Sequence, residues 1–283
     1  MARNMVPYRE NFARRLAMMS ARPMLDVQVC DHCNLRCAGC LHFSPLAAER
    51  FCDIDAYAGE LERLSAIEGI GGYFSDIVLM GGEPLLHPQI GELLRVARAI
   101  LPGERVTLCT NGLLLHRMDD AFWDALVSSG VRLAISPYPT RLDYQELLAY
   151  ACSKGAQAFL SDDITGTASG KEAFMRLALD PAGGCDPAGS FVSCPFGGHF
   201  LQLADGAIWP CQVTAHHGPL AERFGLDLHA SADDALPLDS IGSVDQIETF
   251  RRRPHPMCRH CNNGALTVAP WERSKLEAGE WLA

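Results

Sequence analysis

Cysteine is the residue type that offers most chemistry in this chain of 283 residues, which contains 12 of them. Most fall into two groups near opposite ends of the sequence. The first group is Cys33, Cys37 and Cys40, and the second is Cys194, Cys211, Cys258 and Cys261. In a chain long enough to fold around its own core, clustered reduced cysteines more often hold a metal or do redox chemistry than form a disulfide scaffold. The sequence therefore predicts two separate metal sites.

The first group has the spacing Cys-x3-Cys-x2-Cys and directly follows a strand-like run over residues 25–30. Three thiolates at this spacing can bind three irons of a [4Fe–4S] cluster and leave the fourth iron open to a small molecule. The alternative is a zinc site with Cys30 as the fourth ligand. That site would place its two CxxC pairs only three residues apart, whereas zinc ribbons leave about 15 to 20 residues between them.

The segment Gly81-Gly82-Glu83-Pro84 follows the next expected strand, residues 74–80. Alone it could be a tight turn into a helix. Together with the cysteine motif one strand earlier, it resembles the radical S-adenosyl-L-methionine (SAM) superfamily. The resemblance implies that the open iron of the cluster binds SAM and that Gly81, Gly82 and Glu83 hold its amino group. Electron transfer from the cluster would then cleave SAM to a 5′-deoxyadenosyl radical, which abstracts a hydrogen atom from the substrate.

The resemblance also implies contacts between SAM and residues at later strand ends. These are Thr110 and Asn111 after the third expected strand and Ser136 after the fourth. An ordinary strand-terminal turn is the alternative for each. Family members usually have an aromatic residue before the third cysteine, beside the adenine, but here that residue is Gly39. We therefore expect His42 or Phe43 to cover that face of the adenine.

The second group begins with Cys-x11-Gly-x4-Cys, in which Gly206 separates Cys194 from Cys211, and ends with the CxxC pair Cys258 and Cys261. Four thiolates can complete a [4Fe–4S] or a zinc site. The pattern resembles the short auxiliary-cluster (twitch) subgroup of the radical SAM superfamily. The resemblance implies a second, fully protein-ligated [4Fe–4S] cluster with a role in electron transfer or structure. Zinc remains the alternative, because CxxC pairs are ambiguous between the metals.

Strand-like and helix-like runs alternate from residue 25 to residue 160, and a further strand is expected over residues 199–203. Such alternation predicts an α/β fold with a parallel sheet and ligands at the carboxyl ends of the strands. We expect an incomplete (β/α)6 parallel barrel with a small C-terminal iron–sulfur (twitch) domain. The expected divisions are an N-terminal arm over 1–24, the partial barrel over 25–190, the twitch domain over 191–265 and a C-terminal helix over 266–283.

The formal net charge of −10 argues against a general nucleic-acid surface, because such surfaces neutralise phosphates with Lys and Arg. No run reaches the roughly 18 apolar residues of a membrane span. The first residues lack the apolar core and cleavage site of a secretory signal. These features predict a cytoplasmic protein that binds neither nucleic acid nor a membrane.

The resemblance implies an oxidoreductase that abstracts a hydrogen atom from a carbinol carbon of a sugar, aminocyclitol or sugar nucleotide and oxidises it to a ketone. The 2-deoxy-scyllo-inosamine dehydrogenases of the twitch subgroup do this. A flavodoxin- or ferredoxin-type protein would supply the electrons. The alternatives are an epimerase whose hydrogen donor is a thiol such as Cys52 or Cys185, modification of a ribosomal peptide, and a non-catalytic iron–sulfur or zinc protein. The run Arg251 to Arg253 is either a solvated charge run or a phosphate site.

Overall fold

The computed structural model describes residues 21–161 and 174–283, so most of the expected arm over 1–24 lies outside the described residues. Its main sheet has eight strands in the order β5-β4-β3-β2-β1-β7-β8-β9. The first five along the chain are parallel: β1 (Met24–Cys30), β2 (Asp76–Gly81), β3 (Val106–Thr110), β4 (Arg132–Ile135) and β5 (Ala158–Leu160). The strand expected over 199–203 is β7 (Phe200–Ala204), which pairs in parallel with the free edge of β1. The predicted α/β class with a parallel sheet is confirmed.

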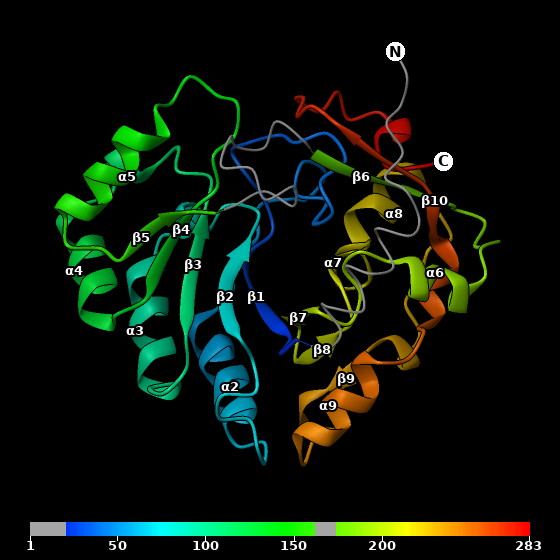
Figure 1. Cartoon of the computed structure of the whole chain (residues 1–283), viewed down its shortest axis with the longest axis horizontal. Coiled ribbons are helices and arrows are strands. Elements are labelled where there is room, and N and C mark those ends of the chain that lie inside the picture. The colour runs from blue at the N-terminus through cyan, green and yellow to red at the C-terminus, as the bar shows by residue number, and fades with distance from the viewer. Residues whose placement is uncertain (1–20, 162–173) are drawn as a thin grey trace.

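Four helices connect the parallel strands and lie along one side of the sheet (Figure 1): α2 (Ile54–Ser65), α3 (Ile90–Ile100), α4 (Asp120–Ser129) and α5 (Tyr144–Ser153). Three of them begin after an aspartate whose carboxylate accepts backbone N–H groups of the first turn, namely Asp53, Asp119 and Asp143. Such a cap satisfies donors that the helix itself leaves unpaired. Acidic caps therefore fix the start of these three helices.

The two faces of the parallel sheet differ in polarity. On β1, Leu25, Val27 and Val29 are fully buried in the main core, which the helices cover. The intervening Asp26 is also buried, and Gln202 of β7 donates a hydrogen bond of 2.7 Å to its carboxylate. Since successive strand residues point to opposite faces, the face away from the helices carries polar groups.

The rest of the chain adds short elements, some to the main sheet and its core and others around a second core. Strands β8 (Ala207–Trp209) and β9 (Leu236–Pro237) extend the main sheet, whereas β6 (Phe174–Leu179) and β10 (Cys261–Ala269) form a separate antiparallel pair. The remaining helices are α6 (Pro187–Ser193), α7 (Gln212–His216), α8 (Gly218–Phe224) and α9 (Val244–Arg251). Side chains of β6, β10, α7 and α8 line the second core together with Phe43 and Trp281.

The expected boundary between residues 190 and 191 does not separate the two cores. Strand β6 precedes that boundary yet packs in the second core, and β7 follows it yet joins the main sheet beside β1. Each unit therefore contains chain from both sides of the boundary, because its strands find hydrogen-bonding edges in the other half of the sequence. The twitch assignment of residues 191–265 stays a prediction.

The C-terminal helix expected over 266–283 is wrong. Strand β10 continues to Ala269, and only the 3₁₀ turn Ala278–Glu280 follows. Residues 270–282, which we call the C-terminal strap, instead bond to other segments: Ala38 donates its N–H to Glu272 O, and Leu179 donates its N–H to Trp281 O. Pro270 lacks the backbone donor that a helix interior needs, and these extended pairings supply the alternative.

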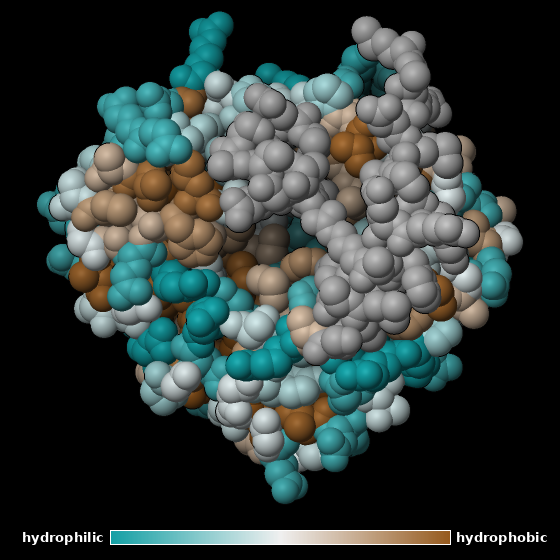
Figure 2. All heavy atoms as spheres, viewed as in Figure 1, coloured by the Kyte–Doolittle hydropathy of each residue, from teal (hydrophilic) through white to brown (hydrophobic). Residues whose placement is uncertain are grey.

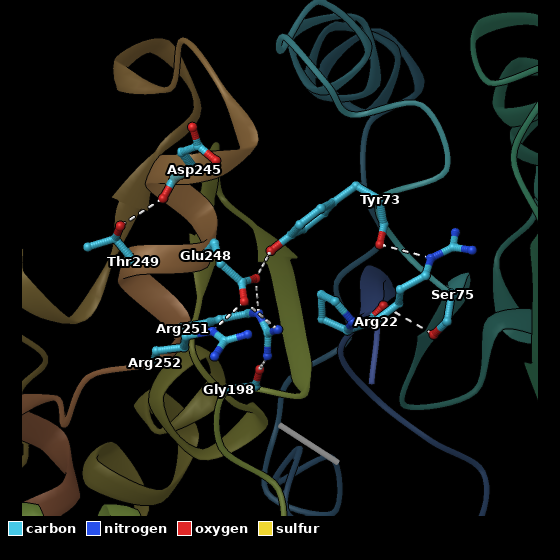
Figure 3. A network of polar contacts seen from close by, with 10 residues as sticks. Arg22, Tyr73, Ser75, Gly198, Asp245, Glu248, Thr249, Arg251 and Arg252 are labelled. Atoms are coloured by element: carbon cyan, nitrogen blue, oxygen red, sulfur yellow. Dashed lines mark hydrogen bonds and ion pairs between the residues drawn. The ribbon is translucent and has the colours of Figure 1, made fainter. Parts of the chain in front are cut away.

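A polar network ties the loop before β2 to α9 (Figure 3). The Tyr73 hydroxyl donates to Glu248 Oε2 at 2.8 Å, and Arg251 donates to Glu248 Oε1 at 2.8 Å. Arg251 is 3% exposed and also donates to Gly198 O at 3.1 Å. Arg252 pairs with the same glutamate. The arginine run therefore has a structural role in joining the two halves, and the alternative of a phosphate site there is not supported.

The face shown in Figure 2 is hollowed near its centre, where Figure 1 draws β1 and β2.

Across residues 21–161 and 174–283, none of the helices combines the length and the apolar character that crossing a bilayer requires.

Candidate functional site

A cavity of about 140 Å³ lies at the carboxyl ends of β1 to β4. Parallel strands deliver the residues that follow them to one edge of the sheet, which is where α/β folds bind ligands. Almost every residue that the sequence singled out for SAM and its cluster lines this cavity: Cys33, Cys37, Cys40, His42, Gly81, Gly82, Glu83, Thr110, Asn111 and Ser136.

The three thiols line the cavity, and Cys33 and Cys40 are half-buried. Cys37 is 5% exposed. Burial raises the pKa of Cys33 and of Cys40, and the neighbouring Glu83 and the two other thiols raise that of Cys33 further. Backbone N–H groups of the turn after Cys40 hydrogen bond to its sulfur. A thiolate here is costly until a cation neutralises it, as iron would.

The arrangement suits a cluster better than a single ion. Within the described residues, no three His, Cys, Asp or Glu side chains converge closely enough to hold one metal ion. The zinc alternative also needs Cys30, but this residue does not line the cavity. Its thiol donates to His32 O at 3.1 Å, and burial raises its pKa to about 12. Three thiols spaced around a cavity fit a [4Fe–4S] cluster with one open iron.

The two glycines of the Gly-Gly-Glu segment are required by close contact with the cysteine loop. A Cβ at Gly81 would lie 2.1 Å from Cys30 O, and one at Gly82 would lie 1.9 Å from His32 O. Gly82 also donates its N–H to Cys30 O at 2.7 Å. Any other residue would push the two loops apart, so the glycines hold the thiol loop against the end of β2.

The Glu83 carboxylate is fixed at the floor of the cavity. It is 1% exposed and accepts hydrogen bonds from Thr110 Oγ1 at 2.6 Å, Leu85 N at 3.0 Å and Asn111 N at 2.9 Å. Burial raises its pKa to about 7, although these three donors act in the opposite direction. A cationic group in the cavity would favour the ionised form. The ammonium group of an amino acid fits this requirement.

Asn111 joins the third strand to the cysteine loop. Its Nδ2 donates to Asn34 Oδ1 at 2.7 Å and lies 3.7 Å from Cys33 Sγ. Ser136 shares a hydrogen bond of 3.0 Å with Ser161, and its Oγ lies 3.7 Å from Cys109 Sγ. The loops after β1, β2, β3 and β4 thus meet around one small volume.

Comparison with known proteins agrees with this geometry. Residues 27–138 match the family model described as the radical SAM superfamily. The chain carries a radical SAM domain. Domains of this family bind SAM and a [4Fe–4S] cluster, and the cavity at the strand ends is where this chain can hold both.

Curated relatives match over part of their length. A GTP 3′,8-cyclase of Chlorobaculum tepidum is 38% identical over 110 residues, which are 38% of this chain and 31% of that protein. The GTP 3′,8-cyclase of Mycolicibacterium smegmatis is 30% identical over 171 residues, covering 58% of this chain and 44% of that protein. The chain spans less than half the length of these relatives.

Among solved structures, that of BtrN in complex with AdoMet and 2-DOIA is similar over 86% of this chain and 93% of BtrN. The TM-score is 0.52 and the sequence identity 14%. At 14% sequence identity, this similarity is evidence for a shared fold alone. It extends beyond the radical SAM domain to most of the chain.

His42 and Phe43 differ in their outcome. His42 lines the cavity, stacks on His216 with ring centroids 5.0 Å apart, and has its pKa lowered to about 4 by burial. Phe43 is fully buried in the second core, away from the cavity wall. Of the two alternatives for covering the adenine, only His42 lines the cavity, because a backbone φ of 52° turns the chain at Phe43 and the second core takes its ring.

The structure also explains why Gly39 stands before the third cysteine. Its φ is 71°, and a Cβ there would lie 3.1 Å from Arg176 Cγ and 3.2 Å from Glu280 O. Strand β6 and the C-terminal strap therefore occupy the space that a larger side chain would need. The departure from the family pattern follows from what covers the loop in this chain.

Two further side chains, which the sequence did not single out, also line the cavity. Cys109 lies on β3, where strand alternation with Thr107 could have shown that it faces the polar side. Tyr138 follows the end of β4, and burial, together with the thiols of Cys37 and Cys40, raises its pKa well above its ordinary value. In the sequence, only the position of Tyr138 two residues after Ser136 indicates that it lies near the cavity.

The four thiols of the second group are near enough to influence one another, although within the described residues no three of them converge closely enough to hold one metal ion. The pKa of Cys261 is raised by burial and by the neighbouring Cys211, Cys194 and Cys258. Cys194 Sγ accepts the backbone N–H of Gly197 at 3.1 Å, and Cys211 Sγ lies 3.3 Å from Thr214 Oγ1. Hydrogen bonds to sulfur and mutually repelling thiolates fit a bound cationic centre. Gly206 has a φ of 75° in the turn between β7 and β8.

Neither cysteine considered as a hydrogen donor lines the SAM cavity. Cys52 lines a separate cavity of about 300 Å³ beside α2, with its sulfur 3.7 Å from His87 Nε2. Cys185 donates its backbone N–H to Arg259 O at 3.0 Å and contributes to the raised pKa of Cys261. Cys185 thus belongs to the surroundings of the second thiol group.

Proposed function

We propose that this chain is a radical SAM oxidoreductase that oxidises a carbinol of a sugar, aminocyclitol or sugar nucleotide to a ketone. Cys33, Cys37 and Cys40 would hold the first [4Fe–4S] cluster, and Glu83 would hold the amino group of SAM. The bound cluster and SAM supply a 5′-deoxyadenosyl radical that takes a hydrogen atom from an unactivated C–H bond. The protein's own task is to hold that carbon near the radical and to exclude other reactions.

The observation that carries this proposal is the pairing of two thiol groups in one chain. The first leaves room for a ligand in its cavity. The thiols of the second, Cys194, Cys211, Cys258 and Cys261, are neighbours of one another. A fully protein-ligated cluster there would supply a one-electron acceptor. Removal of a hydrogen atom followed by an electron and a proton converts a carbinol to a ketone. The likeness to the fold of BtrN over most of the chain supports this proposal.

The surrounding residues would then have defined tasks. The donors around Glu83 keep its carboxylate aimed at the cavity. Asn111 anchors the cysteine loop to β3, and the two glycines hold the loop against β2. We further propose that a flavodoxin- or ferredoxin-type protein supplies electrons in a reducing compartment such as the cytoplasm.

An epimerase is the second candidate, and the position of Cys109 favours it. This thiol lies in the cavity itself, and its S–H bond is weak enough to return a hydrogen atom to a carbon radical. The sequence relatives are named GTP 3′,8-cyclase, which suggests a third candidate function with a nucleotide as the substrate. Because the Chlorobaculum tepidum relative aligns with only 38% of this chain, its similarity is not evidence for the same substrate.

The test is a panel of alcohols deuterated at the carbinol carbon, offered to the reconstituted protein with SAM under anaerobic conditions. The panel contains 2-deoxy-scyllo-inosamine, other aminocyclitols, hexoses and sugar nucleotides, with GTP as a separate arm. Deuterium in 5′-deoxyadenosine together with a ketone product is the expected result, and the Cys33→Ala variant is the control. Deuterium transfer from GTP alone would contradict the proposal.

A further inference from the structure

The loop that carries Cys37 and Cys40 is held by the far end of the chain. In Figure 1 the C-terminal segment lies beside the loop that follows β1. The C-terminal strap makes three hydrogen bonds to this loop: Ala38 N to Glu272 O at 3.0 Å, Ser274 N to Arg36 O at 3.0 Å, and Trp281 Nε1 to Cys40 O at 2.9 Å. Two of these bonds involve the residues on either side of Cys37, and the third is accepted by the backbone of Cys40. Cys33, by contrast, is anchored from β3 through Asn111.

The strap continues directly from the second thiol group. Cys258 lies in the 3₁₀ turn Pro256–His260, and Cys261 is the first residue of β10. Strand β10 pairs with β6 up to Ala269, and the strap begins at the next residue. One extended segment therefore leads from two thiols of the second group to the backbone of the first.

Packing joins the two groups as well. Phe43, three residues after Cys40, is fully buried in the second core. The same core contains Met257, the neighbour of Cys258, and Trp281 of the strap, which are 2% and 1% exposed. A displacement at either group would have to be accommodated by this shared core, since packed side chains tolerate little movement.

The second thiol group lies where β10 begins. Cys261, the first residue of β10, is half-buried and has Cys194, Cys211 and Cys258 as neighbours. A metal centre bound by these thiols would fix the position where β10 begins. The position of β10 in turn determines where the strap meets the cysteine loop.

We propose that loading of the second thiol group orders β10 and the C-terminal strap, and thereby organises the cysteine loop to receive the first cluster. The proposal rests on the assignment of a metal centre to each thiol group. The coupling is a free energy between two sites, so by linkage a loaded first site also favours loading of the second. The strap would act on Cys37 and Cys40 as a positioning element.

The experiment uses the full chain with Cys33, Cys37 and Cys40 replaced by Ser, so that only the second group can take up metal. Amide hydrogen exchange of residues 34–44 and 270–282 is measured by mass spectrometry, after anaerobic reconstitution with iron and sulfide and again after removal of metal by a chelator. We expect loading to slow exchange at Ala38 and Ser274 by about 5-fold or more, the lower range of measured couplings. No catalysis is involved in this readout.

Two variants in the same background test the route. Trp281→Phe keeps an aromatic ring in the core but removes the donor to Cys40 O, and it should reduce the slowing over residues 34–44. Trp123→Phe makes the same change in α4, in the main core, and should leave the slowing intact. Adding Cys258→Ser should abolish both metal uptake and the slowing.

The outcomes separate the two claims. If the background variant binds no iron, the assignment of the second site fails and the coupling fails with it. If iron binds and exchange over residues 34–44 is unchanged, the coupling alone is overturned. Slowing that persists fully in Trp281→Phe would contradict the strap as the connection.

Discussion

The indole N–H of Trp281 donates a hydrogen bond of 2.9 Å to the carbonyl oxygen of Cys40, 241 residues earlier in the chain. The indole ring is 1% exposed and lies in the second core. One side chain thus belongs both to the core of the C-terminal unit and to the loop that presents the first thiol group. The C-terminal strap therefore supports the loop that carries the first thiol group.

Replacing Trp281 should separate packing from hydrogen bonding. Trp281→Ala removes a large buried ring and should lower the free energy of unfolding by about 3 to 5 kcal/mol. Trp281→Phe retains most of the packing and should cost about 1 to 2 kcal/mol, chiefly through the lost bond to Cys40. Urea denaturation of the metal-free protein, followed by circular dichroism, measures both. A Trp281→Phe protein as stable as the wild type would show that the hydrogen bond contributes nothing.

Much of the site was predictable because it depends on local sequence. Cysteine spacing, the Gly-Gly-Glu segment and the positions of strand ends are all set within a few residues. Parallel topology then brings these strand ends to one edge without further information. Ser136, Asn111 and Glu83 therefore line one cavity, as their positions at strand ends predict.

The misplaced residues depend on contacts between distant segments. Phe43 was expected at the adenine, but the second core, formed by residues more than a hundred positions later, takes its ring. A helix was expected over the strap, yet its backbone pairs with the cysteine loop and with β6. Cys109 lines the cavity without having been predicted there, since its face of the sheet depends on which side the helices cover.

Glu83 should be needed for SAM binding and dispensable for iron binding. Glu83→Gln keeps the shape of the side chain but removes the negative charge. It should weaken SAM binding by roughly 10- to 100-fold, the range for a hydrogen bond to a charged group. Equilibrium binding of SAM to the reconstituted protein, with iron content measured in parallel, provides the check. Unchanged SAM affinity would reduce the Gly-Gly-Glu segment to a structural turn.

Asp26 should make the metal-free protein less stable as the pH rises toward neutrality. Burial raises its pKa from 3.8 to about 7 in the folded chain, against the lowering effect of Gln202. Between these values the folded state binds more protons than the unfolded state, so stability falls with rising pH in that window. Asp26→Asn removes this titration and can still accept the bond from Gln202.

The measurement for Asp26 is the free energy of unfolding at pH 5 and at pH 8. The wild type should lose on the order of a few kcal/mol more than Asp26→Asn over this interval, at 1.36 kcal/mol for each pKa unit. Parallel curves for the two proteins would show that Asp26 ionises without cost in the fold.

Cys109 distinguishes oxidation from epimerisation. A dehydrogenase has no need of a thiol donor, so Cys109→Ala should still form the ketone, whereas an epimerase would lose its product. Reactions in D2O with the panel alcohols identify the products by mass spectrometry. An epimerised alcohol that carries solvent deuterium at the attacked carbon, and that disappears in Cys109→Ala, would overturn the oxidation proposal. Cys152→Ala, an exposed cysteine on α5, is the matched control.

The central claim is that two thiol groups each hold a cluster, one of them open to SAM. The most direct measurement is the iron, sulfide and zinc content per chain after anaerobic reconstitution, for the wild type and for the Cys33→Ala/Cys37→Ala/Cys40→Ala variant. We predict about eight irons in the wild type and about four in the variant, which should no longer cleave SAM. One equivalent of zinc with only one cluster in the wild type would contradict the account.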